Sequence, residues 1–177
     1  MSYDLMVFEA SAAPRGRAEF EVWYSAQTEW TEPHDYSDPN VTSPALRKWY
    51  EAITQTFPNM NSSDLAEEDF DSAHPSDYSI GKNVIYVAFA WTQAENAYSL
   101  VRQLAVECAV GFYDVSDDQG GQEIYFPGDE LRPASNGQWR QVAADFRTGD
   151  VGKYIPNDFP QDEPPKRRWF DFLRRDK

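Results

Sequence analysis

The chain has 177 residues, with 30 Asp or Glu against 16 Lys or Arg, and with 6 Trp, 10 Tyr and 11 Phe. Its length fits one compact domain with its own core, and so many aromatic side chains exclude pervasive disorder. The net charge of −14 argues against nucleic acid and anionic membranes as partners, because both would repel the chain at long range.

The N-terminus and the cysteine count indicate the compartment. Met1–Ala10 has an early Asp and neither a basic region nor a long apolar segment, so we expect no secretory signal and a cytoplasmic protein. The longest apolar run, Val84–Trp91, is far shorter than the ~20 residues that span a bilayer. Because Cys108 is the only cysteine, an intramolecular disulfide and a cysteine-rich zinc site are excluded.

The first third of the chain predicts one strand and two helices. Tyr3–Phe8 is a short β-rich run that we expect at or near the centre of a sheet. From Arg17 onwards the aromatic residues recur at helical spacing. Thr31–Thr42 contains two prolines and must be a loop. A second helix follows, with Ser43 as its N-cap and a stop at Pro58.

The middle of the chain predicts four strands and a third helix. Asp77–Ile80 and Val84–Trp91 form a hairpin. Thr92 and Glu95 have the spacing of a capping box, which would open a helix that Gly111 stops. Two more strands are expected, over 112–115 and 123–126, and beyond them the periodicity fades.

This element order predicts an α+β fold: a single domain with an antiparallel or mixed sheet and helices packed on one face. The arrangement expected is ferredoxin-like, a split β-α-β sheet with extra strands, and a generic α+β sandwich is the alternative. Residues 1–156 would form the domain, and 157–177 a Pro-rich, basic and aromatic C-terminal tail.

Charge is distributed unevenly along the chain. Residues 166–177 contain six basic and two acidic residues, so this stretch carries +4 and the rest of the chain −18. The densest acidic stretch lies between Asp64 and Asp71. We expect the tail to dock back on its own acidic body, with its aromatic residues covering a helix or sheet face.

No constellation of residues predicts a catalytic site, a metal site or a cofactor. Glycine-rich phosphate-binding motifs are missing, and Cys108 falls on a buried helix face where thiols are unreactive. His34 with Asp35 and Asp38, completed by His74, could bind zinc or iron, but their spacing is unspecific. The simpler interpretation makes His34 a hydrogen-bonding loop residue.

Acidic loops with aromatic residues are better candidates for binding a protein partner. Aromatic anchors surrounded by charge are typical of interface cores and their rims. Anchoring of the loop onto the domain is an equally good explanation for the aromatic residues. For the stretch from Asp64 to Asp71 a solvated charged loop is the simpler interpretation, and a negative docking surface for a basic partner is the alternative. Asp114, Asp117, Asp118 and Glu123 could extend that acidic surface if the second hairpin lies nearby. The candidate partner-binding residues are Trp30, Asp35, Tyr36, Asp38, Asp64, Glu67, Glu68, Asp69 and Asp71.

Several features form a pattern along the chain: Tyr3, Asp4, Leu5 and Phe8 in the first strand, Phe57-Pro58 after a helix, the apolar strand at mid-chain, the helix from Thr92, Gly111-Phe112-Tyr113-Asp114, and the basic, aromatic C-terminus. Together they resemble small bacterial immunity proteins, which accompany contact-dependent or type VI-delivered toxins in polymorphic toxin systems. This resemblance implies a cytoplasmic, non-enzymatic protein of interbacterial competition that binds and neutralises one cognate toxin.

The hypothesis is therefore an inhibitor whose acidic surface meets a basic toxin, without nucleic acid, membrane or cofactor. Its oligomeric state is open. One alternative is a small metal-dependent hydrolase or ADP-ribose-processing enzyme. A second is an effector-loading chaperone, which would need a large exposed apolar groove.

Overall fold

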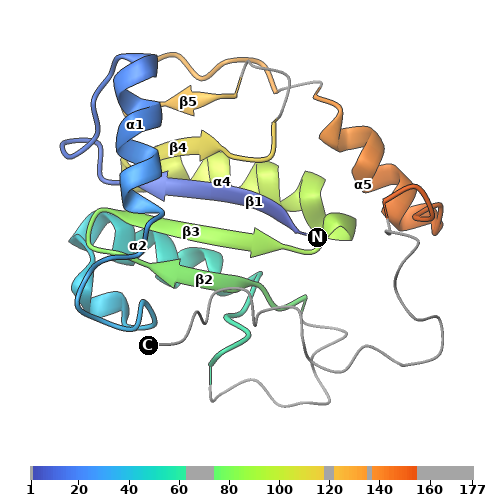
Figure 1. Cartoon of the computed structure of the whole chain (residues 1–177), viewed down its shortest axis with the longest axis horizontal. Coiled ribbons are helices and arrows are strands. Elements are labelled where there is room, and N and C mark those ends of the chain that lie inside the picture. Colours follow the sequence, from blue (N-terminus) through green and yellow to red (C-terminus); the bar gives the residue numbers. More distant parts are fainter. Residues whose placement is uncertain (1, 63–73, 118–121, 135–136, 155–177) are drawn as a thin grey trace.

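The computed structural model describes residues 2–62, 74–117, 122–134 and 137–154. Figure 1 shows a sheet crossed by helices, with a further helix at one end. The strands are β1 (Tyr3–Phe8), β2 (Asp77–Ile80), β3 (Val84–Phe89), β4 (Gly111–Asp114) and β5 (Ile124–Tyr125). The helices are α1 (Arg17–Gln27), α2 (Pro44–Ile53), α4 (Ala94–Cys108) and α5 (Trp139–Thr148), with the 3₁₀ helices η1 (Pro39–Val41) and η3 (Trp91–Gln93).

The strands form one antiparallel sheet in the order β2-β3-β1-β4-β5. Strand β1 pairs along its whole length with β3, from Tyr3 opposite Phe89 to Phe8 opposite Val84, and with β4 on its other side. The predicted α+β class, with helices packed on an antiparallel sheet, is confirmed. So is the central position of the first strand.

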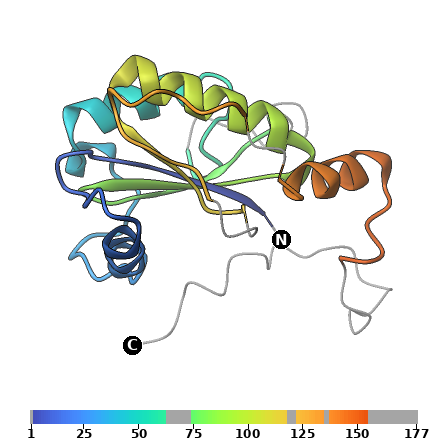
Figure 2. The same ribbon diagram turned by 90° about the horizontal axis from the view of Figure 1, so that it is seen from above.

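The strand order is compatible with two interlocked split β-α-β units, since β3 lies between β1 and β2 while β1 lies between β3 and β4. The ferredoxin-like assignment itself stays a prediction. The expectation that the helices share one face holds for α2 and α4 but is wrong for α1, which lies on the opposite face (Figure 2).

Helices cover both faces of the sheet because the central strand β1 has apolar side chains on both faces. Leu5 and Val7 belong to the core shared with α2 and α4, whereas Met6 and Phe8 belong to the core under α1. All four are fully buried. Because successive strand residues point to opposite faces, burying both sets requires a helix on each side of the sheet.

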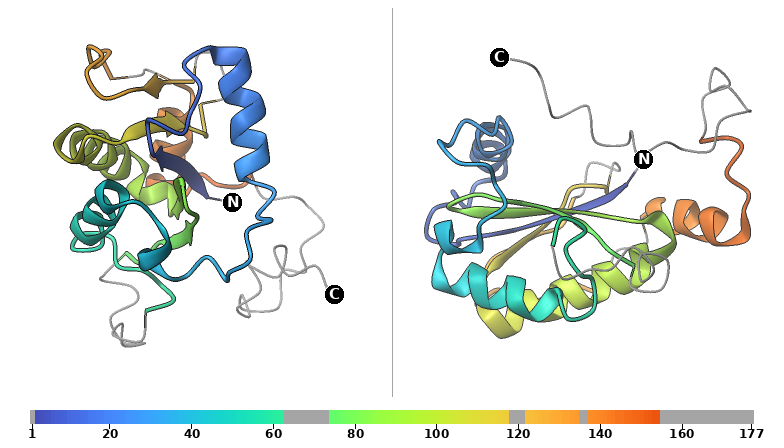
Figure 3. Two further views of the ribbon diagram at one scale, coloured as in Figure 1. Left: turned by 90° about the vertical axis from the view of Figure 1, so that its left-hand side faces the viewer. Right: turned by 90° about the horizontal axis from the view of Figure 1, so that it is seen from below.

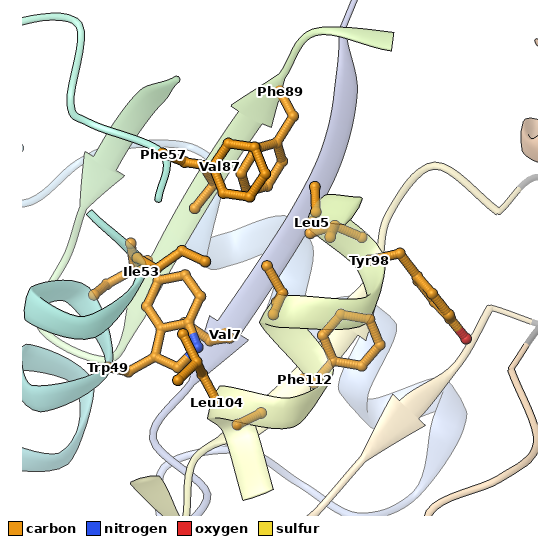
Figure 4. Packing of buried hydrophobic residues seen from close by; sticks show 14 of the residues in the cluster. Leu5, Val7, Trp49, Ile53, Phe57, Val87, Phe89, Tyr98, Leu104 and Phe112 are labelled. Atoms are coloured by element: carbon orange, nitrogen blue, oxygen red, sulfur yellow. The ribbon is translucent and has the colours of Figure 1, made fainter. Parts of the chain in front are cut away.

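The larger core lies between the sheet and the pair α2 and α4. Figure 4 shows the Trp49 ring among Ile53 of its own helix, Leu104 of α4 and Val7 of the sheet. The second core is smaller and rich in aromatic residues. Phe8 meets Phe20 of α1 at a ring-centroid distance of 5.1 Å, and Phe20 is the one fully buried residue of that helix.

The predicted helix starts have different outcomes. At α2, the Ser43 hydroxyl accepts a hydrogen bond from the Leu46 amide at 3.3 Å, which confirms the N-cap. The capping box at Thr92 and Glu95 is wrong. Thr92 lies inside η3, and the Glu95 carboxylate accepts from the Arg147 guanidinium at 2.9 Å instead.

Gly111 has a different role from the predicted helix stop. Helix α4 ends at Cys108, and its C-cap residue, Ala109, takes the left-handed conformation with φ 56°. Gly111 opens β4, and a Cβ atom there would overlap the ring of Phe8. The glycine is therefore required by the close approach of the central strand's aromatic side chain.

Helix α5 was not expected from the sequence. Its Trp139 ring packs against Tyr3 at 4.9 Å and against Tyr98 at 5.1 Å between centroids. The helix thus closes the end of the larger core where β1 begins. The predicted domain boundary at residue 156 and the tail lie outside the described residues. Within those residues, no helix has the length and apolar character needed to cross a membrane.

The outer edge of β2 is covered at both ends. The Ile80 amide donates to the Tyr36 carbonyl at 2.8 Å, and the Ser76 amide donates to the Pro58 carbonyl at 2.9 Å. The segment that supplies Tyr36 leaves α1 and passes the β2 side of the sheet to reach α2 (Figure 3). That segment carries the candidate site.

We expect Gly111→Ala to lower the free energy of unfolding by about 1 to 3 kcal/mol, because the added methyl group overpacks the core at Phe8. Denaturant unfolding would measure the change. The matched control is Gly152→Ala, since a Cβ there meets no atom within 4 Å. Equal stability of the two variants would contradict the proposed role of Gly111.

Candidate functional site

Four of the predicted partner-binding residues lie in the segment between α1 and α2, residues 28–43, which we call the α1–α2 loop. They are Trp30, Asp35, Tyr36 and Asp38. The loop contains four carboxylates and no Lys or Arg. The other predicted residues, Asp64, Glu67, Glu68, Asp69 and Asp71, lie outside the described part of the chain.

Glu32 fastens this loop to the β2–β3 turn. Its two carboxylate oxygens accept from the Lys82 amide at 3.2 and 3.1 Å, and one of them lies 2.8 Å from the His34 Nε2 atom. Together with the hydrogen bond from Ile80 to Tyr36, this contact holds the loop against the hairpin. Glu32 could not be recognised from the sequence, because its partner is 50 residues away and no local pattern marks it.

The aromatic pair of the loop is held in a fixed arrangement. Trp30 and Tyr36 both have positive φ, 52° and 61°. Their ring centroids lie 5.0 Å apart in an edge-to-face contact, and Trp30 also packs against Tyr86. Both rings are half-buried. They therefore anchor the loop, and their contact with a partner stays a prediction.

The two loop aspartates are exposed and locally ordered. One oxygen of Asp35 accepts from the Ser37 amide and hydroxyl, and one oxygen of Asp38 accepts from the Asn40 amide at 2.8 Å. The hydrogen bonds from Ser37 lower the pKa of Asp35. Hydrogen bonds from the described residues thus position both carboxylates while their second oxygens accept none.

The geometry at His34 does not favour a metal site. Its Nδ1 atom accepts from the Tyr36 amide at 3.2 Å, and its Nε2 atom faces Glu32. Both ring nitrogens thus have protein partners, in keeping with a hydrogen-bonding loop residue. Among residues 2–62, 74–117, 122–134 and 137–154, no three His, Cys, Asp or Glu side chains are placed to hold a metal ion.

A second acidic group is buried at the α5 end of the sheet. Asp114, Asp117 and Glu123 are 0%, 5% and 5% exposed, so the prediction that they extend the acidic surface is wrong. Asp118, which the same prediction named, lies outside the described residues. Glu123 accepts from the Tyr98 hydroxyl at 2.7 Å and from Arg102 at 2.8 Å. Their environment is that of an internal ionic network.

Asp114 is the most deeply buried of these three carboxylates. The Tyr3 hydroxyl is 3.5 Å from its carboxylate oxygens. Burial, followed by the negative charges of Asp117 and Glu123, raises the pKa of Asp114 to about 7. Cys108 is also buried, and burial raises the pKa of its thiol, as expected for a structural cysteine.

Comparison with known proteins gives no relative: no protein-family model, no curated protein and no solved structure matches the chain.

We expect Glu32→Ala to speed hydrogen exchange at the Lys82 and Ile80 amides by roughly tenfold or more, because a hydrogen bond to a charged group contributes about 1.5 to 3 kcal/mol. Exchange measured by NMR would report both amides. Glu29→Ala is the control, since that carboxylate is exposed in the same loop. Unchanged exchange at both amides would show that Glu32 does not fasten the loop.

We expect Asp114→Asn to change how stability depends on pH. The folded carboxyl keeps its proton to about pH 7, whereas the unfolded one loses it near pH 4, so the wild type loses stability as pH rises through this interval. The variant should match the wild type near pH 4 and be more stable by on the order of 4 kcal/mol at pH 8, because each unit of the pKa difference contributes about 1.4 kcal/mol.

Denaturant unfolding at several pH values would test this, with the exposed Asp150→Asn as the control. If Asp114→Asn and the wild type keep a constant difference from pH 4 to pH 8, Asp114 is ionised normally in the folded protein.

Proposed function

We propose that this chain is a cytoplasmic immunity protein that binds a basic antibacterial toxin through the α1–α2 loop. The observation that carries the proposal is the loop itself. It combines four carboxylates, no Lys or Arg and a half-buried aromatic pair, and Glu32 fastens it to the sheet. The pattern of sequence features shared with immunity proteins supports the same conclusion.

Electrostatics would make capture fast. Asp35 and Asp38 are exposed and each leaves one carboxylate oxygen free of bonds from the described residues. A strongly acidic body steers a basic partner towards it, and charged rims act mainly on the association rate. The carboxylates would compete for cationic groups that the toxin uses on its own substrate.

The aromatic pair would supply the apolar centre of the interface. Trp30 and Tyr36 already pack against each other, and Trp30 also packs against Tyr86, so little conformational entropy would be lost when a partner covers them. Binding energy in protein interfaces concentrates on such aromatic anchors.

The structure gives less support to the two alternatives, a metal-dependent hydrolase and an effector-loading chaperone. A metal-dependent hydrolase using His34 would have to break the contacts of His34 with Glu32 and Tyr36. A chaperone needs a continuous apolar groove, whereas the large apolar side chains exposed among the described residues are Val22, Val106 and Leu131, on three separate segments. Neither arrangement favours these functions over toxin binding.

The test is growth rescue. A protein captured from the source cells by the full-length chain is expressed alone in the bacterial cytoplasm, where it should stop growth, and co-expression of the chain should restore it. The triple variant Trp30→Ala, Asp35→Asn, Asp38→Asn should lose rescue, with a slower association rate that no longer depends strongly on salt.

The control is Glu51→Gln, an exposed carboxylate on α2, which lies on the face of the sheet opposite α1. It should rescue growth like the wild type. A captured protein without toxicity, or full rescue by the triple variant, would rule out the proposed function or this site.

A further inference from the structure

The face of the sheet that carries α1 is only half covered by the described helices and strands. Helix α1 lies beneath one end of the sheet, and Figure 2 shows no described element beneath the end where β1 begins. Under α1, Met6, Phe8 and Tyr113 are buried. One row further along the strands, the side chains on this face are partly exposed.

This partly exposed row runs across three neighbouring strands. Asp77 of β2 pairs with Ala88 of β3, and Ala88 pairs with Asp4 of β1. We call these three residues the open row. Because adjacent strands are spaced about 4.8 Å apart, the two aspartates lie roughly 10 Å from each other, with a methyl group between them.

Asp4 lacks part of its hydrogen bonding. One of its carboxylate oxygens accepts from the Tyr86 hydroxyl at 2.8 Å. The other, Oδ1, is inaccessible and accepts no hydrogen bond from the described residues. A buried carboxylate oxygen without a donor is costly, so the site calls for a cation or an N–H group.

We propose that the C-terminal segment 157–177 of the same chain docks on the open row, with arginines against Asp4 and Asp77 and an aromatic ring over Ala88. Residues 166–177 carry six basic side chains together with Trp169, Phe170, Phe172 and Leu173. Guanidinium groups pair with carboxylates in bidentate geometry, and the small Ala88 leaves room for a flat ring.

Chain connectivity and charge both favour this occupant. The described chain ends at Tyr154, after α5, which lies beside the end of the sheet where β1 begins. The twelve residues 155–166 can extend about 40 Å at 3.3 to 3.6 Å each, comparable to the diameter of a domain this size. A second copy that docked through the same face would place its own Asp4 and Asp77 against those of the first copy, and these like charges would repel each other.

Paramagnetic NMR on the full-length chain tests the proposal. Cys108→Ala with Asp176→Cys allows a nitroxide label at the tail. We expect loss of the amide signals of Asp4, Ser79 and Ala88, while the signal of Gln103, exposed on α4 beyond the opposite face, persists. Ala88→Arg, or replacement of Arg167, Arg168, Arg174 and Arg175 by Glu, should restore the lost signals.

The matched control is Ala18→Arg, which places the same side chain on an exposed position of α1 and should leave the signal loss unchanged. If the amide signals are still lost in the Ala88→Arg variant, or if the loss is centred on another surface, the proposal is wrong. A mixture of isotope-labelled chain and separately spin-labelled chain should show no loss, and loss there would assign the face to a second copy. No toxin enters the experiment, so its outcome is independent of the proposed function.

Discussion

The burial of β1 on both faces is the constraint on which the rest of the structure depends. With Leu5 and Val7 on one side and Met6 and Phe8 on the other, the central strand requires helices above and below the sheet. The chain between β1 and β2 must then supply α1 to one face and α2 to the other. Its crossing past the β2–β3 turn brings Glu32 to Lys82 and so creates the fastened loop.

The acidic surface of the protein is smaller than the net charge of the chain suggests, because some of the carboxylates are buried. Asp114, Asp117 and Glu123 are inside the protein, where Arg102 and the tyrosine hydroxyls partly compensate them. Buried carboxylates of this kind are costly, and Asp114 responds by holding its proton. The acidic surface of the described residues therefore depends on fewer groups, and those of the α1–α2 loop share their segment with the aromatic pair Trp30 and Tyr36.

Local signals in the sequence predicted most of the elements. The Ser43-Pro44 start of α2, the hairpin around Gly81 and the central first strand depend on short patterns, and they were predicted correctly. The stripe Trp139, Val142, Ala143 and Phe146 of α5 is also visible in the sequence but was overlooked among less periodic residues. Periodicity showed which side of α1 is apolar, although it could not show which sheet face that side covers. At the candidate site, Trp30 and Tyr36 could be chosen from composition, whereas Glu32 acts through a partner 50 residues away.

The covered edge of β2 has a consequence for how this protein behaves at high concentration. An unprotected edge strand offers free amides and carbonyls to another chain and invites intermolecular sheet growth. Here Tyr36 occupies one end of that edge and Pro58 the other. The loop that presents the acidic groups thus also guards the sheet against aggregation, so changes to its fastening would reduce solubility before they unfold the core.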